Sequence, residues 1–443
     1  MARLFGTDGV RGLANKEITA PLALQLGEAA ARVLAKGNLG HRPKAIIGQD
    51  TRQSSGLLAQ AVAAGLASAG IDVEHLGEIP TPGVAYLTAE QDYDLGVVIS
   101  ASHNPFHDNG IKFISGNGFK LPDALEDEIQ AVLGQEWDRP TGDGVGFISE
   151  NAMVSDRVYI DHLIRSGNSL KGLRIALDCA NGAASDFAPR VFQKLGADVV
   201  VINAAPDGRN INDKAGSTHP QQLQALTVAT GADFGFAFDG DADRCLAVDH
   251  AGKLVNGDQI MGMLAVAMKE EGQLKRNTLV LTVMSNLGLH LAMRDKGIKT
   301  VSTKVGDRYV LEEMLAHGYN IGGEQSGHVI NLDHATTGDG TLTAVLVASA
   351  VAKQGKKLAQ MVEFVKMLPQ TLINVSGVDK TRVDAVSKEV AEEEAKLGET
   401  GRILLRASGT EPLIRVMVEA ATQEQADEVA GRLASVVKEK LAL

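Results

Sequence analysis

The sequence predicts an α/β protein with three tandem, similar α/β domains that have mixed sheets, followed by a smaller α+β domain at the C-terminus. One observation is a repeat: an apolar strand, a small polar loop and a helix rich in Ala and Leu recur three times along the 443 residues, each time followed by another β-rich run. Such βαβ units build parallel or mixed sheets covered by helices. The other observation is length, because a chain of this size exceeds one ordinary hydrophobic core.

The three repeats have matched beginnings and ends. Their first strands cover residues 44–50, 173–178 and 278–283, and the β-rich runs after their helices cover residues 71–75, 197–201 and 298–302. The helices in between end near Gly70, Gly196 and Gly297. A glycine just past a helix supplies the left-handed residue with which many helices end. The three segments therefore look like copies of one architecture.

Polar, turn-rich segments separate the repeats and predict four domains. They lie at residues 134–146, 255–258 and 367–369. The predicted domains are residues 1–152, 153–256, 257–368 and 369–443, within the usual size range of domains. In the last domain we expect a strand at 371–375, a helix at 383–397, strands at 401–407 and 412–420, and a closing helix at 423–440. This order differs from the βαβ repeat.

The composition argues against nucleic acid and membranes as partners. Lys and Arg number 43 against 55 Asp and Glu, which gives a formal charge of −12, and aromatic residues make up 4%. Both features disfavour a polyanionic partner and a base-stacking surface. No apolar stretch is long enough to span a bilayer and the N-terminus has no apolar signal core, so we expect a cytoplasmic protein.

The chain has two cysteines, Cys179 and Cys245, each within a predicted buried strand. We interpret both as inert core thiols of a protein from a reducing compartment.

A serine follows the β-branched strand at residues 97–99, in the polar sequence SASHNP. We expect Ser102 to be exposed at the end of this strand, where open α/β sheets bind ligands. A serine placed there can carry a phosphoryl group when a charged neighbour activates it. The alternative is a turn in which Ser and Asn cap backbone groups, and this loop taken alone favours the turn.

Three carboxylates, Asp239, Asp241 and Asp243, stand between the apolar runs 234–238 and 245–248. Alternate residues of an extended loop project to one side, so these side chains can converge on one hard cation such as Mg²⁺. An EF-hand is disfavoured because no Glu stands at the twelfth position of the loop. The alternative is an acidic hairpin turn, for which Asp-Gly is a signal.

Two further loops carry hydrogen-bonding and basic groups. In GEQSGH, Glu324 and Ser326 suit sugar hydroxyls or an ammonium, and His328 is a candidate proton shuttle. A flexible turn and a structural histidine are the alternatives there. The stretch 406–415 places hydroxyls between two arginines and is typical of a phosphate site. Its candidate residues are Arg406, Ser408, Gly409, Thr410 and Arg415.

Together with GTDGVRG near the N-terminus, the loops SASHNP, DGDADR, GEQSGH and RASGTEP follow the order seen in the α-D-phosphohexomutase superfamily. The resemblance covers essentially the whole chain. It implies four domains arranged as a heart around a central cleft, the last of them similar to TATA-binding-protein folds. Motifs for ATP or dinucleotide binding are absent from the sequence.

The resemblance also implies an activity. Phospho-Ser102 would exchange phosphoryl groups with a phosphosugar through a 1,6-bisphosphate, with one Mg²⁺ per chain held by Ser102, Asp239, Asp241 and Asp243. Among members of this superfamily, the variants GTDGVRG, SASHNP and GEQSGH imply glucosamine 6-phosphate and glucosamine 1-phosphate as the substrates that are interconverted. These compounds feed UDP-N-acetylglucosamine and cell-wall precursor synthesis. Glucosamine or glucose 1,6-bisphosphate would act as the activator. The oligomeric state stays open, a homodimer included.

The resemblance assigns roles residue by residue. The implied catalytic residues are Ser102, Lys112, His328 and Arg11. The implied substrate-binding residues are Thr7, His103, Arg244, Glu324, Ser326, Arg406, Ser408, Gly409, Thr410 and Arg415. Some relatives carry a histidine where this chain has Asp307. The carboxylate of Asp307 is a candidate group for favouring a cationic amino sugar.

Other functions remain as alternatives. One alternative is the same reaction on glucose or mannose phosphates. Enzymes with those substrates are distinguished from this one mainly by the short sugar loop. A metal phosphatase that uses phosphoserine is disfavoured, because the chain lacks the clustered His and Asp ligands of a multi-metal site. A silent phosphosugar-binding regulator is disfavoured because Ser102 and all three aspartates are present.

Overall fold

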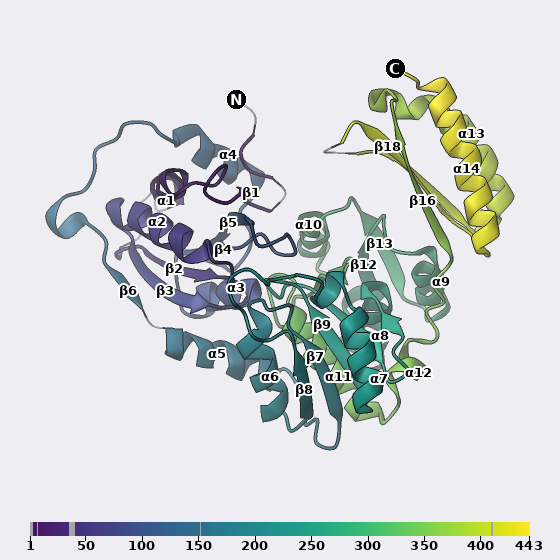
Figure 1. Ribbon diagram of the computed structural model, residues 1–443, viewed down its shortest axis with the longest axis horizontal. Coiled ribbons are helices and arrows are strands. Elements are labelled where there is room, and N and C mark those ends of the chain that lie inside the picture. The colour runs from purple at the N-terminus through teal and green to yellow at the C-terminus, as the bar shows by residue number, and fades with distance from the viewer. Residues whose placement is uncertain (1–2, 7, 35–39, 151, 409–410) are drawn as a thin grey trace. The chain divides into compact units, whose positions relative to one another are not determined.

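In the computed structural model the described residues are 3–6, 8–34, 40–150, 152–408 and 411–443 (Figure 1). The chain divides into two compact units. The first comprises Met1–Met284 and Ile298–Glu363, and the second comprises Ser285–Gly297 and Phe364–Leu443. No helix in the described part of the chain combines the length and apolarity needed to cross a bilayer.

The first sheet of the larger unit has six strands in the order β1-β5-β4-β2-β3-β6. These are β1 (Val10–Leu13), β2 (Lys44–Gln49), β3 (Asp72–Glu78), β4 (Leu95–Ile99), β5 (Asp108–Ser115) and β6 (Ile148–Glu150). The central strand β2 runs parallel to β3 and β4, whereas β5 is antiparallel to β4 and β1. The sheet is therefore mixed, as the repeat predicts.

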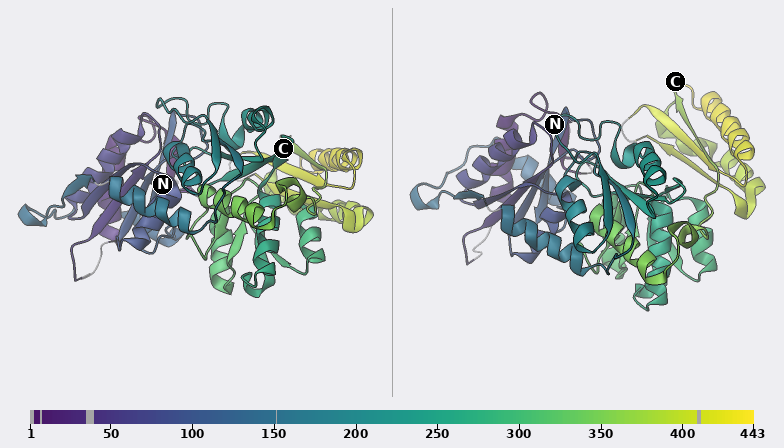
Figure 2. Two further views of the ribbon diagram at one scale, coloured as in Figure 1. Left: turned by 90° about the horizontal axis from the view of Figure 1, so that it is seen from below. Right: turned by 60° about the horizontal axis from the view of Figure 1, so that its bottom comes forward.

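Helices cover both faces of this sheet (Figures 1 and 2). They are α1 (Ala20–Leu34), α2 (Ser55–Ser68), α3 (Thr81–Glu90) and α4 (Asp123–Val132). Ala45 and Ile47 of β2 join one core with residues of α1 and α2. Gly48, the next residue after Ile47, faces α3, where a Cβ would lie 2.4 Å from a methyl of Val84. Alternation along the strand thus sends successive side chains to opposite helical layers.

The second sheet has the order β11-β10-β9-β7-β8. Its strands are β7 (Arg174–Asp178), β8 (Asp198–Ile202), β9 (Phe234–Phe238), β10 (Cys245–Asp249) and β11 (Leu254–Val255), and its helices are α5 (Ala152–Arg165), α6 (Ala184–Lys194) and α7 (Gln221–Thr230). β7 is parallel to β8 and β9, and β9 forms an antiparallel hairpin with β10. This hairpin presents the acidic loop at its turn.

The third sheet has the order β13-β12-β14-β15. Its strands are β12 (Thr278–Thr282), β13 (Lys299–Thr303), β14 (Ile321–Gly323) and β15 (Val329–Asn331), and the helices of this region are α8 (Gly257–Glu270), α10 (Asp307–His317), α11 (Gly340–Gln354) and α12 (Leu358–Val362). β12 is parallel to β13 and β14, whereas β15 returns antiparallel to β14. The β14–β15 turn is the predicted sugar loop.

The smaller unit is an antiparallel sheet, β16-β18-β17, packed against helices. Its elements are β16 (Gln370–Ser376), α13 (Ser387–Leu397), β17 (Arg402–Ala407), β18 (Leu413–Glu419), α14 (Gln423–Lys440) and α9 (Leu287–Asp295). The backbone N–H of Leu287 donates to Glu419 at 2.8 Å, and the Asn286 side chain bonds both the N–H and the C=O of Leu368. These bonds tie α9 to the C-terminal segment.

The three repeats are confirmed. Each first strand pairs in parallel with the strand after its helix. Gly70, Gly196 and Gly297 take φ values of 92°, 96° and 66°, the left-handed conformation expected after a helix. The third repeat differs in one respect, because its helix α9 groups with the smaller unit although β12 and β13 belong to the larger one.

Two local expectations were wrong. The helix expected at 383–397 begins only at Ser387, because a 3₁₀ segment occupies Lys380–Val386 and Arg382 within it has non-helical dihedral angles. Cys179 lies just after β7 and not within it, since that strand ends at Asp178. Both cysteines are nevertheless buried and free, as expected for core thiols.

Candidate active site

Ser102 follows β4 and is buried, so the expectation of an exposed serine was wrong. Only 1% of the residue is exposed. Its Oγ donates to Oδ2 of Asp239 at 2.7 Å and lies 3.3 Å from Nδ1 of His103. Its backbone N–H donates to Oγ of Ser100 at 2.9 Å. The acidic loop of another sheet covers the serine, which the order of local residues does not reveal.

The three aspartates converge, although not along an extended loop as expected. They lie on a tight turn at the end of the β9–β10 hairpin, in which Ala242 has a φ of 57° and its N–H donates to the carbonyl of Asp239 at 3.0 Å. One carboxylate oxygen from each of Asp239, Asp241 and Asp243 lies within 4.8 Å of the others. The hairpin turn and the carboxylate cluster are therefore the same structure.

This cluster fits a hard divalent cation. Asp241 and Asp243 each have a buried Oδ1 with no hydrogen-bond partner among the described residues. Burial, together with the charges of Asp243 and Asp241, raises the pKa of Asp239 well above its ordinary value. Buried oxygens that repel one another are stabilised by a cation, and carboxylate oxygens are the ligands that Mg²⁺ prefers.

Lysines supply positive charge next to the cluster. Nζ of Lys112 lies 2.8 Å from Oδ2 of Asp241 and 2.9 Å from Oδ2 of Asp8. Burial alone would lower the pKa of Lys112, but the two carboxylates raise it above its ordinary value. Lys120 reaches Oδ1 of Asp8 at 2.6 Å and also pairs with Asp307. The side chain of Lys112 is therefore held as an ammonium.

Asp8 joins these cations and was missed by the sequence analysis. Arg11, Lys112 and Lys120 all pair with it. Although burial opposes ionisation, these three cations lower the pKa of Asp8 well below its ordinary value. The signal available in the sequence was a carboxylate inside the glycine-flanked turn GTDGVRG. Thr7 of the same turn lies outside the described residues.

His328 bridges two carboxylates. Its Nδ1 lies 3.5 Å from Oδ2 of Asp243, and its Nε2 lies 3.5 Å from Oδ2 of Asp307. The N–H of Gly338 donates to Nε2 at 3.2 Å, so the neutral ring carries its proton on Nδ1, facing Asp243. Burial lowers the pKa of His328, but Asp243 and Asp307 outweigh it and raise that pKa above its ordinary value.

Asp307 is paired within the protein. Its carboxylate bonds Lys120 and lies against His328. A cationic amino sugar would therefore have to compete with Lys120 and His328 for this carboxylate. No sequence pattern reveals this pairing, because Lys120 stands far from Asp307 along the chain.

The sugar loop has defined local bonds. The N–H of Glu324 donates to the carbonyl of His328 at 2.9 Å, and the N–H of Gly327 donates to the carbonyl of Glu324 at 3.0 Å. Oε1 of Glu324 accepts from the N–H of Gly306 at 3.1 Å. Ser326 is exposed at the tip. The turn is an ordered hairpin end that presents one carboxylate and one hydroxyl.

Arg244 and His103 complete the surroundings of the serine. The N–H of Arg244 donates to Oδ1 of Asp239 at 3.1 Å, and its Nε lies 3.8 Å from Asp243. Burial opposes its charge, but Asp243, Asp239 and Glu324 raise the pKa of Arg244. Burial and the charges of Arg244 and Arg11 lower the pKa of His103 to about 4. His103 is therefore neutral near pH 7.

The predicted phosphate loop belongs to the smaller unit. Arg406 and Arg415 face each other as a register pair of β17 and β18, and burial together with Arg415 lowers the pKa of Arg406. Arg415 donates to Glu411 at 2.8 Å. Ser408 is buried, and its Oγ accepts from the N–H of Glu411 at 3.2 Å. Two adjacent like charges attract an anion.

Lys380 is a further cation at this loop that the sequence analysis missed. Its Nζ donates to the carbonyls of Ser408 and Glu411 at 2.8 and 3.2 Å. Gly409 and Thr410 lie outside the described residues. The structure thus describes Arg406, Ser408 and Arg415 as one cluster and leaves the centre of the turn undescribed.

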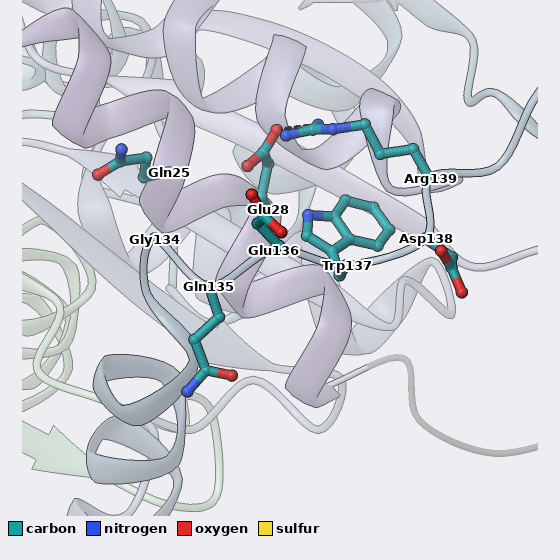
Figure 3. A pocket seen from close by; sticks show the side chains of 8 residues that line it. All are labelled: Gln25, Glu28, Gly134, Gln135, Glu136, Trp137, Asp138 and Arg139. Atoms are coloured by element: carbon teal, nitrogen blue, oxygen red, sulfur yellow. Dashed lines mark hydrogen bonds and ion pairs between the residues drawn. The ribbon is translucent and has the colours of Figure 1, made fainter.

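A separate groove lies beside α1 (Figure 3). It is lined by Gln25, Glu28, Gly134, Gln135, Glu136, Trp137, Asp138 and Arg139. The Trp137 ring has the guanidinium groups of Arg32 and Arg139 5.4 and 5.1 Å from its centroid, and Arg139 pairs with Glu28. These contacts fasten the segment after α4 to α1. None of the predicted site residues that the structure describes lines the groove.

Family models of phosphoglucomutase/phosphomannomutase match almost the whole chain. Their alpha/beta/alpha domains I, II and III match residues 2–138, 157–252 and 256–368, and their C-terminal domain matches residues 372–436. The chain belongs to the phosphoglucomutase/phosphomannomutase family and is an isomerase that works by phosphoryl transfer. This confirms the resemblance inferred from the five loops.

Within this family the chain is similar to phosphoglucosamine mutases. That of Bifidobacterium animalis subsp. lactis is 60% identical over 454 residues, and that of a Nocardioides species is 58% identical over 449 residues. Each alignment covers 100% of both chains.

A solved structure confirms the fold. The phosphoglucomutase/phosphomannomutase family protein of Burkholderia thailandensis superimposes with a TM-score of 0.82 at 23% identity, covering 100% of this chain and 99% of that one. The agreement concerns the fold alone. Three mixed α/β domains followed by a C-terminal domain are thereby confirmed.

Proposed function

We propose that this chain interconverts glucosamine 6-phosphate and glucosamine 1-phosphate. The observation that carries the chemistry is the position of Ser102 Oγ, 2.7 Å from Asp239 within a buried carboxylate cluster. The choice of sugar is supported by the phosphoglucosamine mutases at 58–60% identity, whose substrate is carried over to this chain as part of the proposal.

The reaction proceeds in two transfers. Phospho-Ser102 gives its phosphoryl group to the free hydroxyl of the sugar phosphate: the Oγ–P bond breaks, a sugar O–P bond forms, and the hydroxyl proton passes by way of a base to Oγ of Ser102. The resulting 1,6-bisphosphate reorients, and its other phosphoryl group returns to Ser102. Positioning and neutralisation of charge supply most of the catalysis of such transfers. A hexose 1,6-bisphosphate therefore also serves to load the serine.

We assign Asp239, Asp241 and Asp243, with an oxygen on Ser102, to the binding of one Mg²⁺ per chain. The bound ion supplies positive charge that stabilises the phosphoryl oxygens in the transition state. The unpartnered Oδ1 atoms of Asp241 and Asp243 support this assignment.

Lys112 and His328 are the groups proposed to hold protons at the site. Asp241 and Asp8 raise the pKa of Lys112, so Nζ begins as an ammonium and acts as a cation and proton donor. His328 carries a proton on Nδ1 in its neutral form and has Asp307 near Nε2. Arg11 adds positive charge beside Asp8.

The remaining predicted residues are assigned to the substrate. Glu324 and Ser326 would bond the sugar, and Thr7, His103 and Arg244 would bond the phosphoryl group being transferred. The arginine pair of β17 and β18, with Ser408, would hold the phosphate that does not react; its charges suit bidentate bonds to phosphate oxygens. Gly409 and Thr410 are assigned to the same site on the sequence alone.

Reaction on glucose or mannose phosphates is the second candidate. The pairing of Asp307 with Lys120 favours it, because that carboxylate is no longer free to meet an ammonium. Glu324 then remains as the carboxylate proposed to sense the amino group.

We further propose that the enzyme works in the cytoplasm. Two buried cysteines with free thiols support a reducing compartment.

The decisive experiment is a substrate panel with Mg²⁺ and a 1,6-bisphosphate activator. The purified chain is assayed on the 1- and 6-phosphates of glucosamine, glucose and mannose. We expect the highest kcat/KM on glucosamine phosphates, and intact-mass analysis to find one phosphate on Ser102 after incubation with the bisphosphate. A preference for glucose phosphate would transfer the proposal to the second candidate. No phosphate on the serine would overturn the phosphoserine mechanism.

A further inference from the structure

A fully buried arginine, Arg52, binds the loop that carries Ser102. None of the motifs identified in the sequence includes it. Its Nη2 donates to the carbonyls of Ser102 and Asn104 at 3.0 and 2.7 Å, and its Nε donates to the carbonyl of Asp108 at 2.9 Å. Nη1 lies 3.3 Å from the carboxylate of Asp50. One planar guanidinium thus binds three backbone carbonyls of the loop.

A second side chain from a different domain binds two of the same carbonyls. Nδ2 of Asn212 donates to the carbonyl of Ser102 at 2.9 Å and to that of Asn104 at 3.1 Å. Asn212 is buried and has a φ of 59°, a conformation that asparagine tolerates better than most residues. The carbonyl of Ser102 therefore accepts hydrogen bonds from both Arg52 and Asn212.

The conformation of the serine explains what these bonds do. Ser102 has a φ of 49°, in the left-handed region that L-residues with a Cβ rarely adopt. Such a conformation persists only where surrounding bonds determine it. Asp50 extends the support, because it accepts from the hydroxyl of Ser100 at 2.6 Å, whose oxygen in turn accepts the N–H of Ser102.

We propose that Arg52 and Asn212 are positioning residues that hold the Ser102 loop in its left-handed conformation and so aim Oγ at the transferring phosphoryl group. Neither side chain is assigned a contact with substrate, and both act through the carbonyls of Ser102 and Asn104. The proposal rests on the phosphoserine mechanism described above. It predicts that loss of either side chain slows transfer to and from the serine without weakening the binding of the sugar phosphate.

The test uses the chain of residues 1–443 and two variants of it. Arg52→Lys keeps a positive charge but loses the planar fork, and Asn212→Gly removes the amide while tolerating the positive φ. Matched controls are Arg32→Lys, since Arg32 also donates to the carbonyl of Val132, and Asn15→Gly, since Asn15 has a φ of 60°. The melting temperature is measured for each, and all assays are run where each protein is folded.

The primary readout is the rate at which a hexose 1,6-bisphosphate phosphorylates Ser102, followed by intact mass. We expect each variant to slow this rate and kcat about 100-fold, with KM changed less than about threefold, while the controls match the wild type. Because both side chains bind the same carbonyls, the double variant should lose less than the product of the single losses.

Wild-type rates in both folded variants would overturn the inference. If Arg52→Lys fails to fold, Asn212→Gly alone decides. A rise in KM with unchanged kcat would also overturn it, because that split indicates lost binding. Failure of the wild type itself to take up phosphate would refute the proposed function, an outcome distinct from any difference among the variants.

Discussion

The pairing of charged side chains around Ser102 differs from that at the arginine pair of the C-terminal unit. Around the serine, Asp8, Lys112 and Asp241 are buried or nearly so, and each pairs with an opposite charge at hydrogen-bond distance. In the smaller unit, Arg406 and Arg415 stand opposite each other with like charge and are partly exposed. One region has its charges largely matched, and the other keeps an excess of one sign.

This difference indicates which region is suited to stabilising a transition state and which is suited to binding an anion. Buried, paired charges are already oriented, so they stabilise a transition state without reorganising. Partly exposed like charges remain hydrated and repel each other. An anion that binds between them is stabilised by both charges, and it can reach them directly from solvent. We therefore expect changes near Ser102 to affect kcat and changes at the arginine pair to affect KM.

The largest effect should come from Ser102→Ala. Without Oγ there is no atom to carry the phosphoryl group, so turnover should fall to background while the melting temperature stays close to that of the wild type. The fold should survive because the substitution removes a single hydroxyl. Residual turnover at the wild-type rate would remove the serine from the mechanism.

Asp241→Asn should follow. Loss of one carboxylate weakens metal binding and leaves Lys112 without part of its counter-charge, at a cost on the order of several kcal/mol, or about 100- to 1000-fold in kcat. Activity is measured against Mg²⁺ concentration. Asp249→Asn is the matched control, because Asp249 is also a buried aspartate of this hairpin and accepts from the nearby backbone N–H groups of Ala251 and Lys253.

Removal of metal tests the same region without mutation. EDTA should abolish turnover of the wild type, and added Mg²⁺ should restore it, because three crowded carboxylates lack their cation when the metal is removed. The assay is repeated after dialysis against buffer without metal. A rate unaffected by chelation would show that Lys112 and the arginines suffice.

A smaller effect, and of a different kind, is expected for Arg415→Ala. A hydrogen bond to a charged group contributes about 1.5–3 kcal/mol, so KM should rise about tenfold or more, with a lesser fall in kcat. Arg432→Ala is the control, because Arg432 also lies in the smaller unit and pairs with Glu393. If kcat/KM is unchanged in Arg415→Ala, the smaller unit takes no part in binding the phosphate.

The smallest effect should be that of Glu324→Gln. The substitution keeps shape and removes charge, so it should lower kcat/KM about fivefold on glucosamine 6-phosphate and less on glucose 6-phosphate. The ratio of the two values is the measurement. Equal losses on both sugars would indicate that Glu324 orders the loop through Gly306 and does not sense the amino group.

The sequence by itself determined the repeated architecture. Strand, loop and helix periodicity are local properties, and a glycine after a helix acts through its own φ, so Gly70, Gly196 and Gly297 could be assigned without knowing what surrounds them. The same holds for the acidic run, because three carboxylates within five positions must lie near one another whatever the path of the loop.

Tertiary structure alone decided how these groups are paired. Ser102 is buried because the β9–β10 hairpin meets the end of β4, and the aspartates converge through a turn at Ala242. Asp8 with Lys120, and Arg52 with the carbonyl of Ser102, are contacts between separate segments. Local patterns cannot predict such pairs, because buried charges and carbonyls take whichever partners the packed domains bring within hydrogen-bond distance.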